Sequence, residues 1–306
     1  MKKLAEEEGT VIVLVAFLMV AFLTLVALVV DVGMLYLERI KLVNTLDAIV
    51  LSGVQELPED SLAAKDVAQE YAANNNLASD QLTINVIATH EIQAVGKKKV
   101  AMKFAPVIGI DEVEITSSSK AKVSQVNAIR GAVPFGVVKQ NFSYGQSYYL
   151  KYGAGGPANA SGLNGNFGAL ALGGTGAKNY EENIKYGHDQ QLEIGDTVTT
   201  EPGNMSGPTR KGVEYRIDQC NHVPSCSYDS VKPKCSRLLY VPVIDDLGKG
   251  RSTSEIVGFA AFFLEGMDKK KGNSYVEGRF IKWFADSAEM DSNAQDFGLR
   301  KVKLVD

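Results

Sequence analysis

The chain has 306 residues, of which 45% are apolar and 22% are charged, and its formal net charge is -4. These values are typical of a globular protein with one or two domains, and they exclude a disordered chain, a collagen and a disulfide-dense miniprotein. The weak acidity gives no support to a nucleic-acid partner, since nucleic-acid-binding proteins usually carry a basic patch. The apolar residues are concentrated near the start of the chain.

The densest apolar run is VIVLVAFLMVAFLTLVALVV at residues 11–30, which contains no charge and a single hydroxyl group, that of Thr24. At about 1.5 Å per residue, a helix of this length covers roughly 30 Å, the thickness of the hydrocarbon core of a bilayer. A buried core helix rarely stays apolar on every face over such a length. A cleaved secretory signal has a shorter apolar region followed by an A-x-A-like site, whereas Asp31 and Val32 follow here. We therefore predict a retained anchor in the lipid bilayer, with these anchor residues: Val11, Leu14, Phe17, Val20, Phe22, Val26 and Val30.

The helical pattern continues beyond the apolar run. Apolar residues recur at spacings of three, four and seven with polar residues between them, as in an amphipathic helix. They are Leu35, Leu42, Leu46, Ile49 and Val50. The first proline of the chain is Pro58, so we predict a short tail over residues 1–9 and one continuous transmembrane and amphipathic helix over residues 10–57. Its second half carries one apolar stripe, for a partner or for the chain's own domain.

These residues resemble the N-terminus of the tight-adherence (Tad) pilus-assembly proteins of the TadE/TadG type. Members of that family have a glycine before the apolar run, a D-x-G-x-x-Y step after it, and a continuation rich in Asn, Asp and Ala. The matching positions are Gly9, Asp31, Gly33, Tyr36, Asn44, Asp47 and Ala48. The resemblance implies a pilin-like, single-pass protein of the bacterial inner or cytoplasmic membrane, with its C-terminal domain outside the cytoplasm. It also implies that the N-terminal helix packs against other pilin-like or pilus-assembly proteins.

The sequence departs from the family pattern at the processing site, and its flanking charges do not determine the orientation. Prepilins carry a glutamate five residues after the cleaved glycine, and Leu14 stands at that position here. The sequence thus lacks the glutamate usual beside a prepilin-peptidase site. Two lysines precede the apolar run, and Arg39 and Lys41 follow it at similar reach, so the positive-inside rule does not choose an orientation. The outward orientation therefore rests on the resemblance, with slight help from the cysteines.

Residues 58–129 predict a small α+β head. Asp60 or Ser61 caps an Ala-rich helix over residues 62–73. Alternating patterns then predict strands, which we place at residues 82–88, 100–105 and 113–123. A helix followed by a strand meander indicates an α+β fold. The resemblance to the TadE/TadG head extends to about residue 125.

The lysine run 97–99 lies beside Gly96, between the first two predicted strands. Glycine followed by three charged residues is typical of a turn. We therefore expect a solvated hairpin tip there, with contact to a membrane surface or an anion as the alternative.

Residues 130–306 predict a Gly-rich and then β-rich C-terminal domain. Nine glycines lie among the 24 residues from Gly153 to Gly176, but neither a G-x4-G-K-[S/T] loop nor a strand-to-helix dinucleotide fingerprint is present. We expect tight turns there and assign no cofactor. Strands are predicted at residues 237–245, 255–266 and 275–285, with Pro242 marking an edge or a bulge. The C-terminal half also resembles the region attached to some Tad-like proteins, which has no established chemistry.

Three cysteines, Cys220, Cys226 and Cys235, lie within sixteen residues of one another. In an exported domain we expect a disulfide closing this loop, either Cys220–Cys226 or Cys220–Cys235. One alternative is zinc ligation by the cysteines together with His222, although the spacing does not match a C-x2-C site. The other alternative is three free thiols. The sequence accordingly assigns no metal ligand.

The histidines, His90, His188 and His222, lie far apart beside polar or turn residues, and we expect them at the surface. Neither G-x-S-x-G nor H-E-x-x-H occurs. We therefore expect no catalytic residue and no enzyme activity.

The preferred hypothesis is a membrane-anchored, pseudopilin-like and non-catalytic component of Tad (Flp-type) pilus assembly. One alternative is a membrane-tethered extracytoplasmic module that binds cell-surface ligands. Another, less favoured, is a tethered hydrolase with its site in the Gly-rich half, which would need a convergent Ser, His and acid that the sequence does not display.

Overall fold

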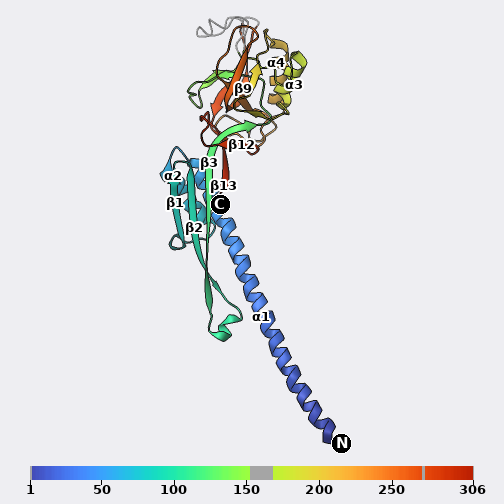
Figure 1. Ribbon diagram of the computed structural model, residues 1–306. Coiled ribbons are helices and arrows are strands. Elements are labelled where there is room, and N and C mark those ends of the chain that lie inside the picture. The colour runs from blue at the N-terminus through green and yellow to red at the C-terminus, as the bar shows by residue number, and fades with distance from the viewer. Residues whose placement is uncertain (1, 152–167, 271–272, 306) are drawn as a thin grey trace. The chain divides into compact units, whose positions relative to one another are not determined.

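The computed structural model describes residues 2–151, 168–270 and 273–305 (Figure 1). A long apolar N-terminal helix is followed by a sheet-rich region with a few helices, which confirms the predicted α+β class and the β-rich C-terminal part. The chain forms two compact units, residues 1–123 together with 302–306, and residues 124–301. Strand β3 (Glu112–Ile129) passes from the first unit into the second, so the units divide after Val123 and not after residue 129, where the boundary was expected.

Helix α1 (Lys2–Gly53) is continuous over 52 residues and is followed by the short 3-10 helix η1 (Val54–Glu56). Leu57 then adopts an extended backbone before Pro58, because proline disfavours the helical conformation in the preceding residue. The predicted single helix is confirmed, but it begins at Lys2 and so includes residues 2–9, which were expected to form a separate tail.

The second half of α1 supplies the core of the first unit. Leu42, Leu46, Ile49 and Val50 are all buried there, as the apolar stripe predicted, and Leu35 is half-buried. Helix α2 (Ser61–Asn74) packs against α1, and the Asp60 carboxylate caps it by accepting the backbone N–H groups of Leu62 and Ala63.

Gly53 permits the close approach of α1 and α2. A Cβ atom added at Gly53 would lie 2.6 Å from the carbonyl oxygen of Ala64. Buried alanines on α2, at positions 64, 68 and 72, keep the same interface narrow.

Three antiparallel strands complete the first unit: β1 (Leu82–Ala88), β2 (Glu91–Ala101) and the first part of β3, with the one-turn helix η2 (Ser79–Gln81) before them. The predicted strand at residues 82–88 is confirmed to the residue. The alternating exposure of its side chains follows the predicted period of two.

The predicted hairpin tip at residues 97–99 and the strand at 100–105 are wrong. Lys97, Lys98 and Lys99 lie inside β2, which ends at Ala101, and they pair with Thr116, Ile115 and Glu114 of β3. Long-range partners explain the difference, since Gly96 packs against Leu46 and the lysines face glutamates of α1 and β3. The real tip is the 3-10 helix η3 (Ala105–Ile108), which ends at Gly109 in the left-handed conformation with φ of 85°.

The second unit is built on a sheet with the strand order β4-β8-β9-β10-β5, and β7 pairs with β9 outside this path. These strands are β4 (Val137–Val138), β5 (Ser147–Tyr149), β7 (Thr197–Thr199), β8 (Leu238–Ile244), β9 (Thr253–Lys270) and β10 (Asn273–Ile281). The three long strands confirm the predictions at residues 237–245, 255–266 and 275–285, the last of which divides into β10 and β11 (Trp283–Phe284). The predicted bulge near Pro242 is present as a register shift between Val243 and Ile244.

The central strands of this sheet are buried on both faces, which explains the continuous apolar run in β9. Phe259, Ala261 and Phe263 join one hydrophobic layer, and the alternate residues Ala260, Phe262 and Leu264 join the other. Helices α3 (Ala177–Tyr186) and α4 (Ser206–Asp218) cover the second layer through Tyr180, Ile184 and Val213. The sequence did not predict these two helices.

Short strands complete the second unit. β6 (Leu192–Glu193) and β12 (Ala288–Asp291) pair with residues 125–129 of β3, and β11 pairs in parallel with β13 (Leu299–Val305) at Leu299 and Arg300. Most of the Gly-rich stretch, where tight turns were expected, lies outside the described residues.

Candidate functional site on helix α1 and a cysteine–histidine cluster

The apolar run of α1 has no protein neighbours over most of its surface. The predicted anchor residues, Val11, Leu14, Phe17, Val20, Phe22, Val26 and Val30, are 42–73% exposed. A core helix of a globular protein would be buried instead. Among the described residues, α1 is the one helix long and apolar enough to cross a membrane.

The tip of the β2–β3 hairpin lies against this apolar run. η3 contacts α1, and together they line an apolar groove of about 400 Å³ whose walls include Val20, Leu23 and Leu28 of the helix. The tip exposes large apolar side chains, with Val107 91% and Ile108 76% exposed. The tip thus presents an apolar surface at the level of the predicted membrane segment.

Asp31 holds the tip to the helix. Its carboxylate accepts backbone N–H groups from Lys103 at 2.9 Å, Phe104 at 3.1 Å and Ala105 at 2.7 Å, where η3 begins. Three donors converging on one carboxylate are favourable, because the first N–H groups of a helix have no partner within it. Asp31 is buried although it directly follows the apolar run.

Polar contacts farther along α1 join it to the sheet. The Ser119 hydroxyl donates to the Asp47 carboxylate at 2.5 Å. Glu38 accepts hydrogen bonds from Lys41 and Lys98, each at 2.7 Å. These lysines lower the pKa of Glu38 to about 2. Asp31 and Glu38 therefore lie on the same face of α1 as the buried stripe.

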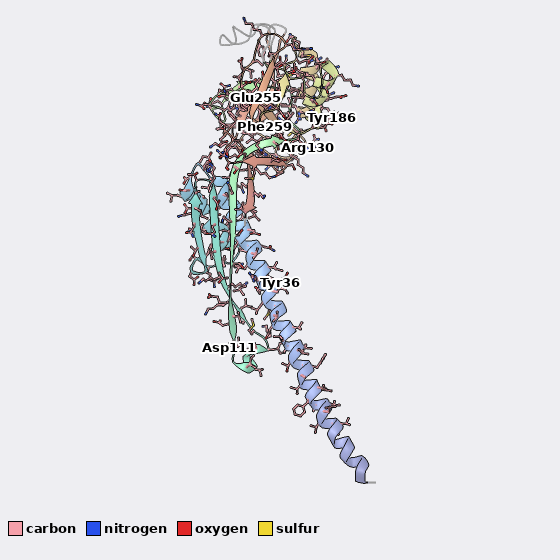
Figure 2. All side chains as sticks on the ribbon, viewed as in Figure 1. Tyr36, Asp111, Arg130, Tyr186, Glu255 and Phe259 are labelled. Carbon is pink, nitrogen blue, oxygen red and sulfur yellow. The ribbon has the colours of Figure 1, made fainter. Side chains whose placement is uncertain are left out.

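The opposite face of α1 stays uncovered beyond the apolar run. Gly33, Leu37, Ile40 and Asn44 recur at intervals of three and four residues and are exposed, with Tyr36 beside them. Tyr36 and Leu37 are 65% and 58% exposed, and Figure 2 labels Tyr36 on the helix. A Cβ atom added at Gly33 would meet nothing within 4 Å. This face, Gly33–Tyr36–Leu37–Ile40–Asn44, is called the open stripe below.

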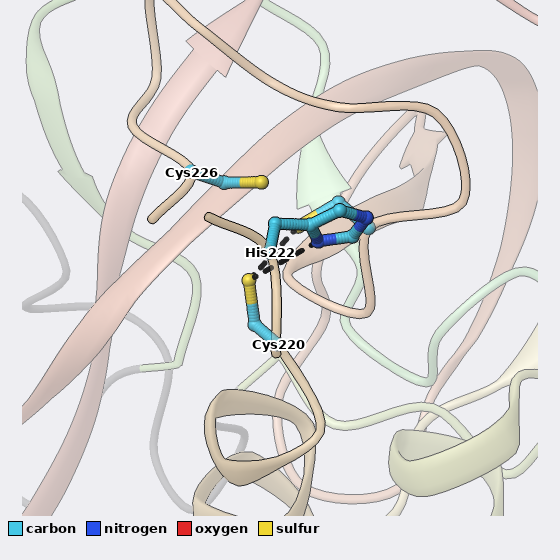
Figure 3. Close-up of side chains that lie close together, drawn as sticks. Cys220, His222 and Cys226 are labelled. Carbon is cyan, nitrogen blue, oxygen red and sulfur yellow. Dashed lines mark hydrogen bonds between the residues drawn. The ribbon is translucent and has the colours of Figure 1, made fainter. Parts of the chain in front are cut away.

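In the second unit, the loop between α4 and β8 brings the three cysteines and His222 together. Their ligand atoms all lie within 4.8 Å of one another. The Cys220 sulfur is 3.5 Å from that of Cys235 and 3.8 Å from Nδ1 of His222, and Figure 3 shows Cys220, His222 and Cys226 pointing toward a common centre. Cys226 and Cys235 are buried at the edge of the hydrophobic core, and all three thiols are free. The predicted disulfide partners are therefore neighbours without an S–S bond between them.

The surroundings shift the pKa values of two of these thiols in opposite directions. Burial raises the pKa of Cys220, but hydrogen bonds from His222, Cys235 and Cys226 outweigh this effect and lower the pKa to about 6. Burial raises the pKa of Cys235 to about 12. The surroundings therefore favour the thiolate form more at Cys220 than at Cys235.

Two arginines surround the cluster. The Arg237 guanidinium donates to the carbonyl oxygen of Cys226 at 3.3 Å, and that of Arg216 donates to Ser236 at 2.9 Å and to Ile184. Within the described part of the chain, the hydrogen bonds of both guanidinium groups go to backbone carbonyls and none to a carboxylate. Positive charge thus accumulates beside the sulfurs.

Residues 9–56 match the model of the Tad family, described as "Putative Flp pilus-assembly TadE/G-like". This segment carries a TadE/G-like domain. The match covers the apolar run, the Asp31 position and the buried stripe of α1. No curated protein and no solved structure matches the chain. With the apolar helix, the domain indicates a membrane-anchored protein that takes part in pilus assembly.

The family-motif positions of the TadE/G-like domain divide into two sets. Asp31 and Asp47 contact the head, whereas Gly33, Tyr36 and Asn44 lie on the open stripe. Gly9 lies within α1, in a stretch where only the backbone is described. The resemblance found the motif, but only the structure separates head-facing from outward-facing positions.

The expectation that all histidines lie at the surface is wrong for His188. Its ring is buried, and a Cβ atom at Gly173 would lie 2.7 Å from it. Sequence reasoning also missed the tip residues Val107 and Ile108, although the run PVIGI in a polar neighbourhood is a signal that could have found them.

Proposed function

We propose that the protein is a pseudopilin-like, structural component of Tad (Flp-type) pilus assembly. In this proposal α1 spans the bacterial inner or cytoplasmic membrane once, and the rest of the chain lies outside the cytoplasm. The TadE/G-like domain and the exposed apolar run support the pilus-assembly and membrane parts. The chain acts by anchoring and packing, and we assign no residue a catalytic role.

The open stripe is the observation that carries the packing role. It lies opposite the buried stripe of Leu42, Leu46 and Ile49, so α1 has one apolar face toward its own head and a second toward the outside. Small residues such as Gly33 allow a neighbouring helix to approach closely, as they do in membrane helix pairs. We propose that the occupant of the open stripe is the N-terminal helix of another pilin-like subunit.

The hairpin tip extends the membrane contact. From Asp31 to Val20, α1 descends eleven positions, or roughly 16 Å at about 1.5 Å per residue, which is about half of the hydrocarbon thickness. The tip lies against this part of the helix, and its exposed Val107 and Ile108 would be costly in water. We propose that the tip enters the outer half of the bilayer beside α1.

Filament assembly in cells tests the function. In a strain that lacks the native gene, Ile40→Asp should reduce pilus number strongly, because it places a charge on the open stripe. Arg39→Asp is the matched control, since Arg39 is exposed on a different face of α1. Equal numbers of pili with both variants, at equal protein levels, would contradict the proposed packing role.

Orientation is tested by fusing alkaline phosphatase after Asp306. The enzyme folds only outside the cytoplasm, so the fusion should be active in cells. An inactive fusion of the full-length protein would contradict the proposed orientation but not the membrane anchor.

A further inference from the structure

The cysteine–histidine cluster is independent of the TadE/G-like domain and lies wholly in the second unit. We propose that Cys220, His222, Cys226 and Cys235 bind one structural zinc ion. The site goes beyond the pilus-assembly role, and its test does not depend on that role.

The distances fit a tetrahedral metal site. Zinc lies about 2.3 Å from sulfur and about 2.0–2.1 Å from imidazole nitrogen, so neighbouring ligands in a tetrahedron are roughly 3.6–3.8 Å apart. Here the Cys220 and Cys235 sulfurs are 3.5 Å apart, and the Cys220 sulfur is 3.8 Å from Nδ1 of His222. Four such atoms within 4.8 Å of one another leave room for one ion at their centre.

A disulfide explains the cluster less completely. An S–S bond is about 2.05 Å long, well below the observed 3.5 Å. Joining Cys220 to Cys235 would also leave Cys226 and His222 beside the bond with no role, whereas a zinc ion uses all four side chains.

The loop that holds the four ligands has no helix or strand of its own, so a bound ion would stabilise it. Residues 219–237 connect α4 to β8 with no helix or strand of their own, which is uncommon for so long a segment in a compact domain. Cys220 lies two residues after α4 and Cys235 three residues before β8, so one ion would fasten both ends of the loop and, through Cys226, its middle. Lys234, directly before Cys235, has a left-handed backbone with φ of 59°, which residues other than glycine rarely adopt.

The surroundings suit bound thiolates. The backbone N–H groups of Cys226 and Arg237 donate to the sulfurs of Cys220 and Cys235. Three thiolates and a divalent ion carry a net charge of about -1, which the guanidinium groups of Arg216 and Arg237 are placed to balance. Second-shell donors of this kind orient the ligands of metal sites.

The donor set selects the metal and the role. Thiolate and imidazole ligands in a tetrahedral arrangement favour zinc over hard ions such as calcium or magnesium. Four protein ligands leave no open position for a substrate or a water molecule, so the ion would stabilise the loop and would not catalyse a reaction.

The metal content of the full-length protein tests the proposal. The protein is purified in detergent without added reductant, and its zinc is measured by elemental mass spectrometry. We expect one zinc per chain and, after exchange with Co²⁺, the absorption bands of tetrahedral cobalt–thiolate coordination. Removal of zinc by a chelator should speed hydrogen exchange in residues 219–237.

His222→Ala tests the fourth ligand with little risk to folding, because His222 is half-buried. It should weaken zinc binding more than second-shell changes do, that is by more than about 10–100-fold. His90→Ala, in the other unit, is the matched control and should bind zinc as the unchanged chain does.

Three results would overturn the proposal: a protein that binds no zinc and whose mass shows a Cys220–Cys235 disulfide, iron in place of zinc, or unchanged zinc affinity in His222→Ala.

Discussion

The two halves of α1 belong to one continuous helix but face different surroundings. Residues 11–30 are exposed over most of their surface and contact only the hairpin tip among the described residues, whereas residues 31–53 bury one face against the head and leave the open stripe uncovered. Backbone geometry is the same in both halves, so the difference lies in the side chains alone. An apolar residue on α1 therefore has one of three partners in this account: lipid, the chain's own head, or a second helix.

Loss of membrane attachment is the largest change that we expect. Residues 11–30 contain fifteen Val, Leu, Ile and Phe residues, which favour insertion by roughly 5–9 kcal/mol in total, while each central arginine costs about 2.5–3.5 kcal/mol. One arginine should be tolerated. The triple variant Phe17→Arg, Val20→Arg and Leu23→Arg should release the protein from membranes, as measured by the membrane-bound fraction.

The matched control for the triple variant places three arginines on exposed positions of β1, at Thr83, Asn85 and Ile87. It adds the same charge and should stay membrane-bound. Release of both variants alike would show that charge, and not lipid contact of α1, governs the result.

The next effect separates the two faces beyond the membrane segment. Leu46→Ala creates a cavity in the buried stripe and should lower the free energy of unfolding of the first unit by about 2–5 kcal/mol. Leu37→Ala removes the same atoms from the open stripe and should change it by no more than about 0.5 kcal/mol. Denaturant unfolding of the detergent-solubilised protein measures both, and similar losses would mean that the open stripe is packed.

Asp31 tests the link between the tip and the helix. Asp31→Ala removes the acceptor for three N–H groups, so the amides of Lys103, Phe104 and Ala105 should exchange at least about tenfold faster, the effect of losing one charge-assisted hydrogen bond. Asp111→Ala, an exposed carboxylate in the same hairpin, is the control and should leave them unchanged. Unchanged exchange in Asp31→Ala would show that the apolar groove alone holds the tip.

The smallest effect is a pH dependence. The folded-state pKa of Glu38 is about 2, below its ordinary value of 4.5, so its contribution is complete above about pH 4.5 and is lost as the pH falls toward 2. Glu38→Gln should remove this part of the acid sensitivity and shift the thermal midpoint by no more than a few degrees, because Lys41 is exposed and Lys98 is half-exposed. Identical pH profiles for the variant and the unchanged chain would contradict the assignment.

Local patterns predicted the parts of the fold that depend on neighbours in sequence. The α1 stripe, the Asp60 cap and strand β1 follow from periodicity and capping. The lysines of β2 were misplaced because their charge resembles a turn, whereas their glutamate partners on β3 lie more than ten residues away. Helix α4 was missed because Gly207, Pro208 and Gly212 lower its helix propensity.

In the candidate sites, too, the sequence predicted local features but not the contacts between distant residues. The resemblance found Asp31 and Asp47, but their partners lie 72–74 residues away, so their roles were not readable from the sequence. The four residues of the cysteine–histidine cluster have the spacing C-x-H-x3-C-x8-C, which matches no common zinc pattern. Their convergence depends on the path of one irregular loop.

Site-specific photo-crosslinking in cells tests the central claim, that the open stripe binds another pilin-like helix. A photoreactive phenylalanine analogue is placed at Leu37 on the open stripe or at Arg39 on a different face of α1, and the crosslinked partners are identified by mass spectrometry. We expect a crosslink from position 37 to the N-terminal helix of a pilin-like subunit and little or none from position 39. No crosslink at 37, or equal crosslinking at both positions, would contradict it.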